Sequence, residues 1–111
     1  MPPYINRTWL QGTVASTPTM SAISAKTKLT SFQLAVVESW LNPDGEMRSR
    51  KNRVLVEVVG KDSDRVAQHA KLGSWVTLEG YIRSEQFKGQ DLVKIRTLSV
   101  DIWEDAHGEP P

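Results

Sequence analysis

Much of the chain alternates between hydrophobic and polar residues with a period of two, which is typical of β-strands with one buried face. The clearest example is the stretch 28–40, where Thr30, Phe32, Leu34 and Val36 fall on one side. The same pattern, together with β-branched and aromatic residues, predicts five strands, at 6–14, 28–40, 53–60, 74–83 and 91–103.

Breaks in this pattern predict the connections. Residues 42–45 read Asn-Pro-Asp-Gly, a strong turn signal, and residues 84–91 predict a loop tip around Gly89. The small and polar residues 15–25 predict a loop. Within the last strand the side that carries the apolar residues changes, which predicts a β-bulge near 96–97.

One helix is predicted, between Gly60 and Gly73. Asp62 or Ser63 can cap its N-terminus, and Gly73 can end it in a left-handed conformation. Five strands with one helix between strands 3 and 4 is the element order of the OB-fold, an all-β barrel.

Two glycines inside predicted strands, Gly12 and Gly80, suit the sharp bending of a small barrel, although other small β-barrels have the same need. Trp9, Phe32 and Trp75 are the aromatic residues we expect to be buried first, or to lie at a subunit contact.

Length and composition limit the functions available. A chain of 111 residues with 39% hydrophobic and 24% charged residues fits one globular domain, predicted at 1–105, followed by a frayed tail at 106–111. Because the chain has no cysteine, it forms no disulfide, Cys-type zinc site or thiol nucleophile. No apolar run is long enough for a membrane span and no targeting segment is evident, so we expect a cytoplasmic protein.

Catalytic chemistry is hard to find in this sequence. The two histidines, His69 and His107, are isolated, and the acidic residues form no motif. No glycine-rich loop of the kind that binds phosphates is present. We therefore expect a protein that is not an enzyme and has no metal site and no cofactor.

Charge and aromatic residues favour a polyanionic ligand. The last eleven residues hold four of the 13 acidic residues and no lysine or arginine, so the rest of the chain is basic. Trp40 ends a strand just before the 42–45 turn, and four cations follow within six residues, at Arg48, Arg50, Lys51 and Arg53.

Phe87 lies between Arg83 and Lys88 in the other loop tip, and Lys94 and Arg96 share one side of the last strand. Exposed rings that stack unpaired bases, beside cations that contact phosphates, are what single-stranded nucleic acid requires. The structural alternatives are that Trp40 caps the end of the barrel, that Phe87 packs within its own hairpin and that the cations belong to an ordinary solvated loop.

Several stretches resemble the bacterial single-stranded DNA-binding protein family, which has the OB-fold. These are NRTWLQGTVASTP, TSFQLAVVESW, PDGEMRSRKNRVLVEVVGK and AKLGSWVTLEGYIRSEQF, which together with the last strand span about residues 6–103. The resemblance implies stacking roles for Trp40 and Phe87, and phosphate contacts for Lys61, Arg83 and Lys88. Arg53 and Val59 stand where the family often has aromatic residues, so binding should depend more on charge.

The family's long acidic-tipped tail has no counterpart, which makes the chain similar to the short primosomal replication protein B branch. The resemblance implies sequence-independent binding of single-stranded DNA in replication, recombination or repair, by a homo-oligomer, either a dimer or a tetramer. One alternative is an adaptor of the primosomal type that assembles replication-restart proteins on DNA. Another is an RNA or oligosaccharide binder on the same fold.

The predicted nucleic-acid-binding residues are Trp40, Phe87, Arg48, Arg50, Lys51, Arg53, Lys61, Arg83, Lys88, Lys94 and Arg96.

Overall fold

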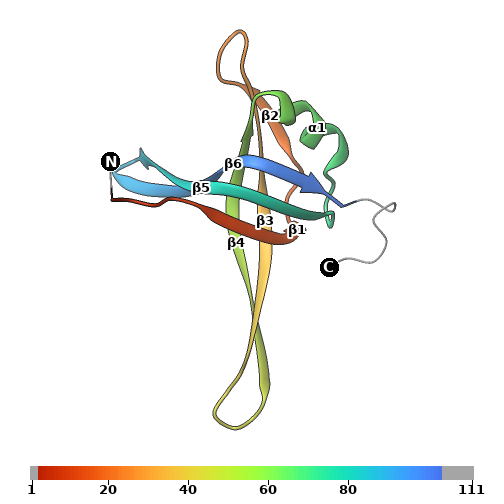
Figure 1. The fold of residues 1–111 in the computed structure, drawn as a ribbon, viewed down its shortest axis with the longest axis vertical. Helices are drawn as coiled ribbons and strands as arrows, with labels where there is room; N and C mark the ends of the chain where they lie inside the picture. Colours follow the sequence, from red (N-terminus) through yellow and green to blue (C-terminus); the bar gives the residue numbers. More distant parts are fainter. Residues whose placement is uncertain (1–2, 104–111) are drawn as a thin grey trace.

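The computed structural model describes residues 3–103 (Figure 1). Its elements are β1 (Thr8–Val14), β2 (Thr19–Ala22), β3 (Lys28–Leu41), β4 (Met47–Val59), α1 (Lys61–His69), β5 (Trp75–Phe87) and β6 (Gln90–Ile102). The strands form one sheet in the order β1-β5-β6-β4-β3-β2, and an additional pairing of β1 with β3 closes five of them into a barrel. β4 and β6 are parallel, and the other pairs are antiparallel. The predicted all-β barrel with one helix is confirmed.

The position predicted for the helix is wrong by one strand. Residues 19–22, predicted as part of a loop, form β2, so α1 lies between the fourth and fifth strands. All four side chains of β2 are exposed, and its backbone pairs with β3 from Thr19↔Ser31 to Ala22↔Lys28. Because backbone pairing rather than side-chain burial holds β2, its sequence carries no period-two pattern.

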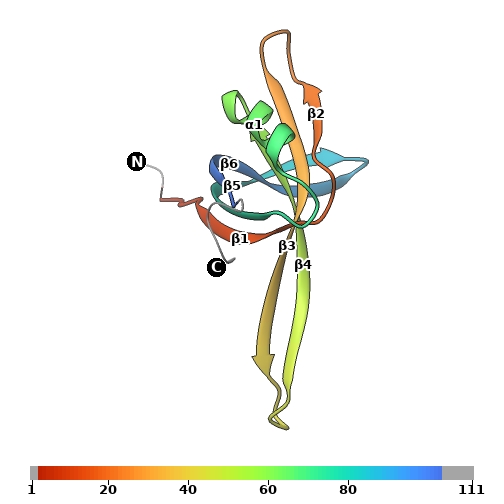
Figure 2. The same ribbon diagram turned by 90° about the vertical axis from the view of Figure 1, so that its right-hand side faces the viewer.

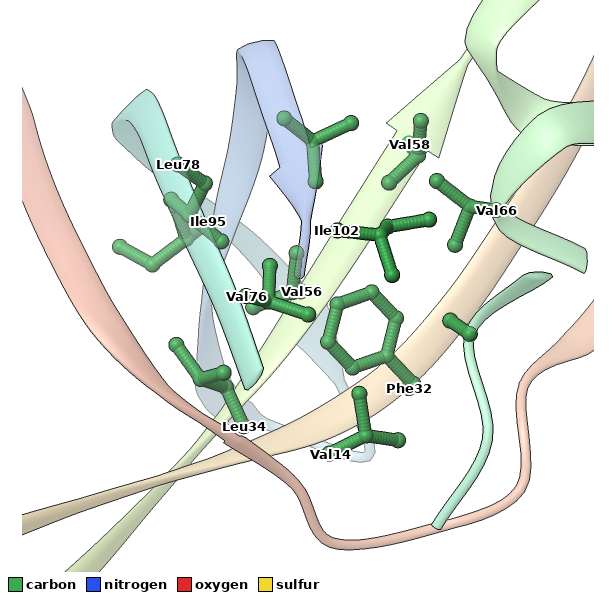
Figure 3. Packing of buried hydrophobic residues seen from close by; sticks show 12 residues of the cluster. Val14, Phe32, Leu34, Val56, Val58, Val66, Val76, Leu78, Ile95 and Ile102 are labelled. Carbon is green, nitrogen blue, oxygen red and sulfur yellow. The ribbon is translucent and has the colours of Figure 1, made fainter. Parts of the chain in front are cut away.

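The core lies inside the barrel and is made by alternate residues of the strands. Phe32 and Leu34 of β3 belong to one cluster with Val56 and Val58 of β4, and Val66 of α1 joins this cluster (Figure 3). Helix α1 therefore covers one end of the barrel.

The expected burial of aromatic residues is confirmed only for Phe32, which is 2% exposed. Trp75 is half-buried and Trp9 is 69% exposed, so Trp9 is not buried within the chain, and its alternative place at a subunit contact stays a prediction. The reason is strand parity, since Leu10 and Val14 of β1 point inward and Trp9 points outward.

The sheet bends where backbones come too close for a side chain. A Cβ atom on Gly12 would collide with the carbonyl oxygen of Ala35 where β1 closes the barrel against β3. At Gly80 the register between β5 and β6 shifts, because Glu79 pairs with Ser99 and Gly80 pairs with Thr97. The predicted bulge is therefore present, with Leu98 as the extra residue, just after the predicted 96–97.

Helix α1 begins and ends differently from the prediction. Its N-cap is Gly60, at a φ of 85°, and no side chain caps the helix, so Asp62 and Ser63 do not have the predicted role. Ala70, in an extended conformation, is the C-cap, whereas Gly73 adopts its positive φ in the turn that leads to β5.

Ser63 is buried instead, and its hydroxyl is satisfied there by the hydroxyl of Thr30 on β3, at 2.7 Å. This contact fixes the helix to the barrel.

Two of the hairpins that extend beyond the barrel point in different directions (Figures 1 and 2). One is formed by the ends of β3 and β4, residues 37–53, and is called the arm below. The other is the β5–β6 hairpin, whose strands reach residue 87 and start again at residue 90, so most of the predicted loop 84–91 is strand. Within residues 3–103 no helix has both the length and the apolar character needed to cross a membrane. The predicted tail at 106–111 lies outside the described residues.

Candidate nucleic-acid interface

The arm is a regular antiparallel ladder that ends in a tight turn. Pairing runs without a break from Leu29↔Val59 to Leu41↔Met47. In the turn, the side-chain carbonyl of Asn42 accepts hydrogen bonds from the backbone N–H groups of Asp44, at 3.0 Å, and Glu46, at 2.8 Å. These bonds confirm the predicted turn and give the arm a defined shape.

Cations project from both faces of the arm, as the alternation along β4 predicts. Arg48 and Arg50 lie on the face that continues the core-facing side of the barrel, which we call the inner face. Lys51 and Arg53 lie on the opposite, outer face. All four residues are exposed.

Trp40 lies on the inner face near the end of the arm, where it pairs directly with Arg48. It is 44% exposed, so part of its side chain is open to a ligand, next to Arg48 on the neighbouring strand. A neighbouring ion pair joins Arg48 to Glu46 in the turn, with 3.6 Å between Nη2 and Oε2. Such an exposed pair is weak, so Arg48 can exchange Glu46 for a phosphate at little cost.

The β5–β6 hairpin presents the second aromatic ring. Phe87 is 60% exposed, and the Nζ atom of Lys88 lies 5.5 Å from the centre of its ring, within the range of a cation–π interaction. Arg83 lies on the same outer side of β5 as Phe87, with its Nε atom 3.9 Å from a carboxylate oxygen of Glu85.

Lys94 and Arg96 are held by carboxylates of the protein itself. The Nζ atom of Lys94 lies 2.8 Å from Oε2 of Glu57 and 2.9 Å from Oε1 of Glu85. Arg96 donates two hydrogen bonds to Oε1 of Glu57, from Nε at 3.1 Å and from Nη2 at 2.9 Å. The Lys94 side chain is 6% exposed and that of Glu57 is 8% exposed, so this ion cluster is buried.

The charges in this cluster stabilise one another. Burial of Glu57 acts to raise its pKa, but the hydrogen bonds and positive charges of Lys94 and Arg96 outweigh it and leave the pKa below its ordinary value. Burial likewise acts to lower the pKa of Lys94, and its two carboxylate partners raise it above its ordinary value. Both groups are therefore charged at neutral pH and satisfied within the protein.

The predicted residues thus fall into separate groups. The arm gathers Trp40 and its four cations, and the β5–β6 hairpin gathers Phe87, Arg83 and Lys88. Lys61 begins α1, at the end of β4 opposite to the arm, and is exposed there. Lys94 and Arg96 form the buried ion cluster with Glu57. The role of each residue toward a ligand stays a prediction.

Sequence reasoning missed a cavity of about 310 Å³ between the bases of the two hairpins and β1. Its lining residues are Thr8, Leu10, Val36, Asn52, Arg53, Val54, Ile82 and Ile95. One signal was available in the sequence, because Ile82 continues the core-facing parity of Val76 and Leu78. In the structure Ile82 is 54% exposed, since the interior of the barrel opens at this point.

A metal centre is not suggested by the geometry of residues 3–103, where no three His, Asp or Glu side chains come together as ligands. The arm and the β5–β6 hairpin expose aromatic rings and cations, and an apolar cavity lies between their bases.

Comparison with known proteins agrees with this geometry. The sequence profile of the single-strand binding protein family matches residues 5–105. No curated protein sequence matches the chain.

Several solved structures share its fold. They include a deletion mutant of the single-stranded DNA binding protein from Thermus aquaticus, with a TM-score of 0.81, 19% identity and coverage of 90% of this chain and 51% of that one. The small single-stranded DNA-binding protein from Streptomyces coelicolor has a TM-score of 0.67, 17% identity and coverage of 90% and 95%, respectively. The SSB from Plasmodium falciparum, in a complex with ssDNA, has a TM-score of 0.80, 18% identity and coverage of 94% and 99%.

At these identities the structural likeness establishes the fold. The chain spans about half the length of the Thermus aquaticus protein. The family profile, by contrast, extends over nearly all the described residues. The chain therefore belongs to the single-strand binding protein family.

Proposed function

We propose that this chain binds single-stranded DNA without sequence preference, in replication, recombination or repair. Bases stack on Trp40 and Phe87, and the cations of the arm neutralise phosphates. The observation that carries the proposal is the end of the arm, where an exposed Trp40 pairs with Arg48 and further cations follow on both faces. Membership of the family and the fold shared with a Plasmodium falciparum SSB in a complex with ssDNA support it.

The chemistry of these groups accounts for binding that ignores sequence. Every base has a flat face that an indole or phenyl ring can cover, and every nucleotide carries the same phosphate. Arg48 and Arg50 lie beside Trp40 on the inner face, whereas Lys51 and Arg53 serve the outer face. A strand that crosses the arm therefore meets positive charge on either side.

Arg83 and Lys88 extend the charge to the β5–β6 hairpin, beside Phe87. Lys94 does not belong to the proposed surface, because its ammonium group is buried between two carboxylates. Lys61 is exposed but remote from the arm, so it contacts DNA only if the bound strand extends from the arm to the start of α1.

The test is the affinity for fluorescent oligo-dT, measured by anisotropy for the wild type and for the Trp40→Ala/Phe87→Ala variant. Two stacked bases at about 1–3 kcal/mol each correspond to a loss of well over tenfold. Met20→Ala/Leu72→Ala is the matched control, because both large apolar side chains are exposed and lie outside the arm and the β5–β6 hairpin. Unchanged affinity in the double variant would remove stacking from the proposal. If the wild type binds only at low salt, the adaptor interpretation is favoured.

We further propose that the chain forms a homo-oligomer through β1. On one side β1 pairs with β5 along Thr8–Thr13, and on the other it pairs with β3 only at Thr13 and Val14. The remaining edge is open beside the exposed Trp9. An open edge with a large apolar residue favours pairing with another chain. Light scattering should therefore give a mass above 12.5 kDa, which Trp9→Arg should reduce. A wild type that is monomeric at micromolar concentration would contradict this.

A further inference from the structure

The cavity at the open end of the barrel is suited to a flat, largely apolar ligand with a polar edge. Its floor consists of aliphatic side chains, including Leu10, Val54 and Ile95, and its polar lining residues are Thr8, Asn52 and Arg53. Its volume of about 310 Å³ lies at the small end of the range for small-molecule pockets, roughly 300–1,000 Å³. None of its lining residues is aromatic.

The inner face of the arm leads directly into this cavity. Three alternate cross-strand pairs lie along it, Trp40 with Arg48, Glu38 with Arg50, and Val36 with Asn52. Val36 and Asn52 line the cavity. At about 3.4 Å per residue, the four steps from Trp40 to Val36 span roughly 14 Å. A strand stacked on Trp40 can therefore reach the cavity within a few nucleotides.

The charges along this route select a polyanion rather than an apolar peptide. Arg48 and Arg50 lie along the route, and Arg53 lines the cavity. One carboxylate, Glu38, lies between them, and its Oε1 atom accepts a hydrogen bond of 3.3 Å from the side-chain amide of Asn52. The second N–H of the Asn52 amide can donate a hydrogen bond and its carbonyl can accept one, so both suit the polar edge of a base.

We propose that this cavity receives one unstacked nucleobase of the bound strand. The base inserts between the aliphatic side chains, with its polar edge toward Asn52 and its phosphate near Arg50 on the inner face. This inference rests on the proposed binding of single-stranded DNA and adds to it a second kind of base contact, insertion rather than stacking.

The test uses a short oligo-dT in which 2-aminopurine replaces one thymine, moved along the strand. Stacking on an aromatic ring or on another base quenches 2-aminopurine, whereas a base inserted among aliphatic side chains is bright and protected from acrylamide. The proposal predicts that at one position the bound oligonucleotide shows bright, protected emission.

Filling the cavity should abolish this signal. Thr8→Met/Val36→Met adds flexible apolar volume without adding a ring, and should weaken binding by about tenfold, as expected for one lost base contact. Thr17→Met/Thr19→Met is the matched control, because both residues are exposed, neither lines the cavity and both lie outside the arm. Asn52→Met, at an exposed position, fills the rim without disturbing the core.

The outcomes separate the two proposals. Binding with quenched or acrylamide-accessible emission at every position would overturn base insertion and leave single-stranded DNA binding intact. Bright emission that persists in both filled variants would also overturn insertion. A wild type that does not bind the oligonucleotide would overturn both.

Discussion

Replacing Lys94 by methionine should destabilise the barrel strongly. The change removes an ammonium group that lies 2.8 Å from Glu57 and 2.9 Å from Glu85, and leaves the buried Glu57 carboxylate with Arg96 alone. Breaking a buried ion pair from one side costs about 3–5 kcal/mol. Because Arg96 remains and Glu85 is half exposed, we expect the lower end of this range, about 3 kcal/mol.

The same substitution at Lys51 is the matched comparison. Lys51 is exposed on the outer face of the arm, so Lys51→Met should change the free energy of unfolding by less than about 0.5 kcal/mol. It should instead weaken binding of oligo-dT and reduce the salt dependence, with the slope of log K against log salt less negative by about 0.7.

Urea and thermal unfolding followed by circular dichroism measure the first effect. For a domain of this size, about 3 kcal/mol corresponds to a fall in Tm of roughly 12–24 °C. Anisotropy at several salt concentrations, below the Tm of each variant, measures the second. If Lys94→Met is as stable as the wild type, the buried ion cluster is not a structural element and this reasoning fails.

Three further predictions concern the barrel itself. The pKa of Glu57 lies below its ordinary value of 4.5 in the folded state, so the charged carboxylate stabilises the fold fully above pH 4.5, and this stabilisation is lost as the pH falls through the lowered pKa. The urea midpoint should therefore decline less steeply on acidification in Glu57→Gln than in the wild type. An equally steep decline would contradict this. Gly12→Ala places a Cβ atom against the carbonyl oxygen of Ala35 and should cost at least about 1–3 kcal/mol in urea unfolding, whereas wild-type stability would refute the close approach. Thr30→Val removes a hydroxyl that donates a hydrogen bond to the backbone carbonyl of Ser63 at 2.9 Å, so it should lower the free energy of unfolding by about 1–3 kcal/mol in the same assay. An unchanged free energy would show that the attachment of α1 does not depend on this contact.

The barrel could be predicted from the sequence wherever burial imposes a pattern. In β3, Phe32 and Leu34 alternate with polar residues because one face is buried, and the prediction of 28–40 agrees closely with Lys28–Leu41. The arm part of β4 has no such pattern, since residues 47–53 are exposed on both faces, and the predicted strand therefore began only at residue 53. Backbone pairing with β3 extends β4 back to Met47, and the side-chain pattern gives no sign of this extension.

The predicted site was limited in a different way. The aromatic-and-cation pattern around Trp40 was readable because its members are close together in the sequence. Lys94 has the same local appearance as an exposed cation, but its partner Glu57 lies 37 positions away and is brought near by the parallel pairing of β4 and β6. Likewise, the cavity combines Thr8, Val36 and Ile82 from three strands that only the closed barrel brings together.

The most direct measurement of the central proposal is the change in tryptophan emission when oligo-dT is titrated into the protein. A base stacked on Trp40 should quench its fluorescence, so the wild-type emission should fall to a plateau. In Trp40→Ala most of this quenching should disappear, although Trp9, Trp75 and Trp103 still emit. Quenching of the same size in Trp40→Ala, or wild-type emission that does not change at saturation, would contradict the account.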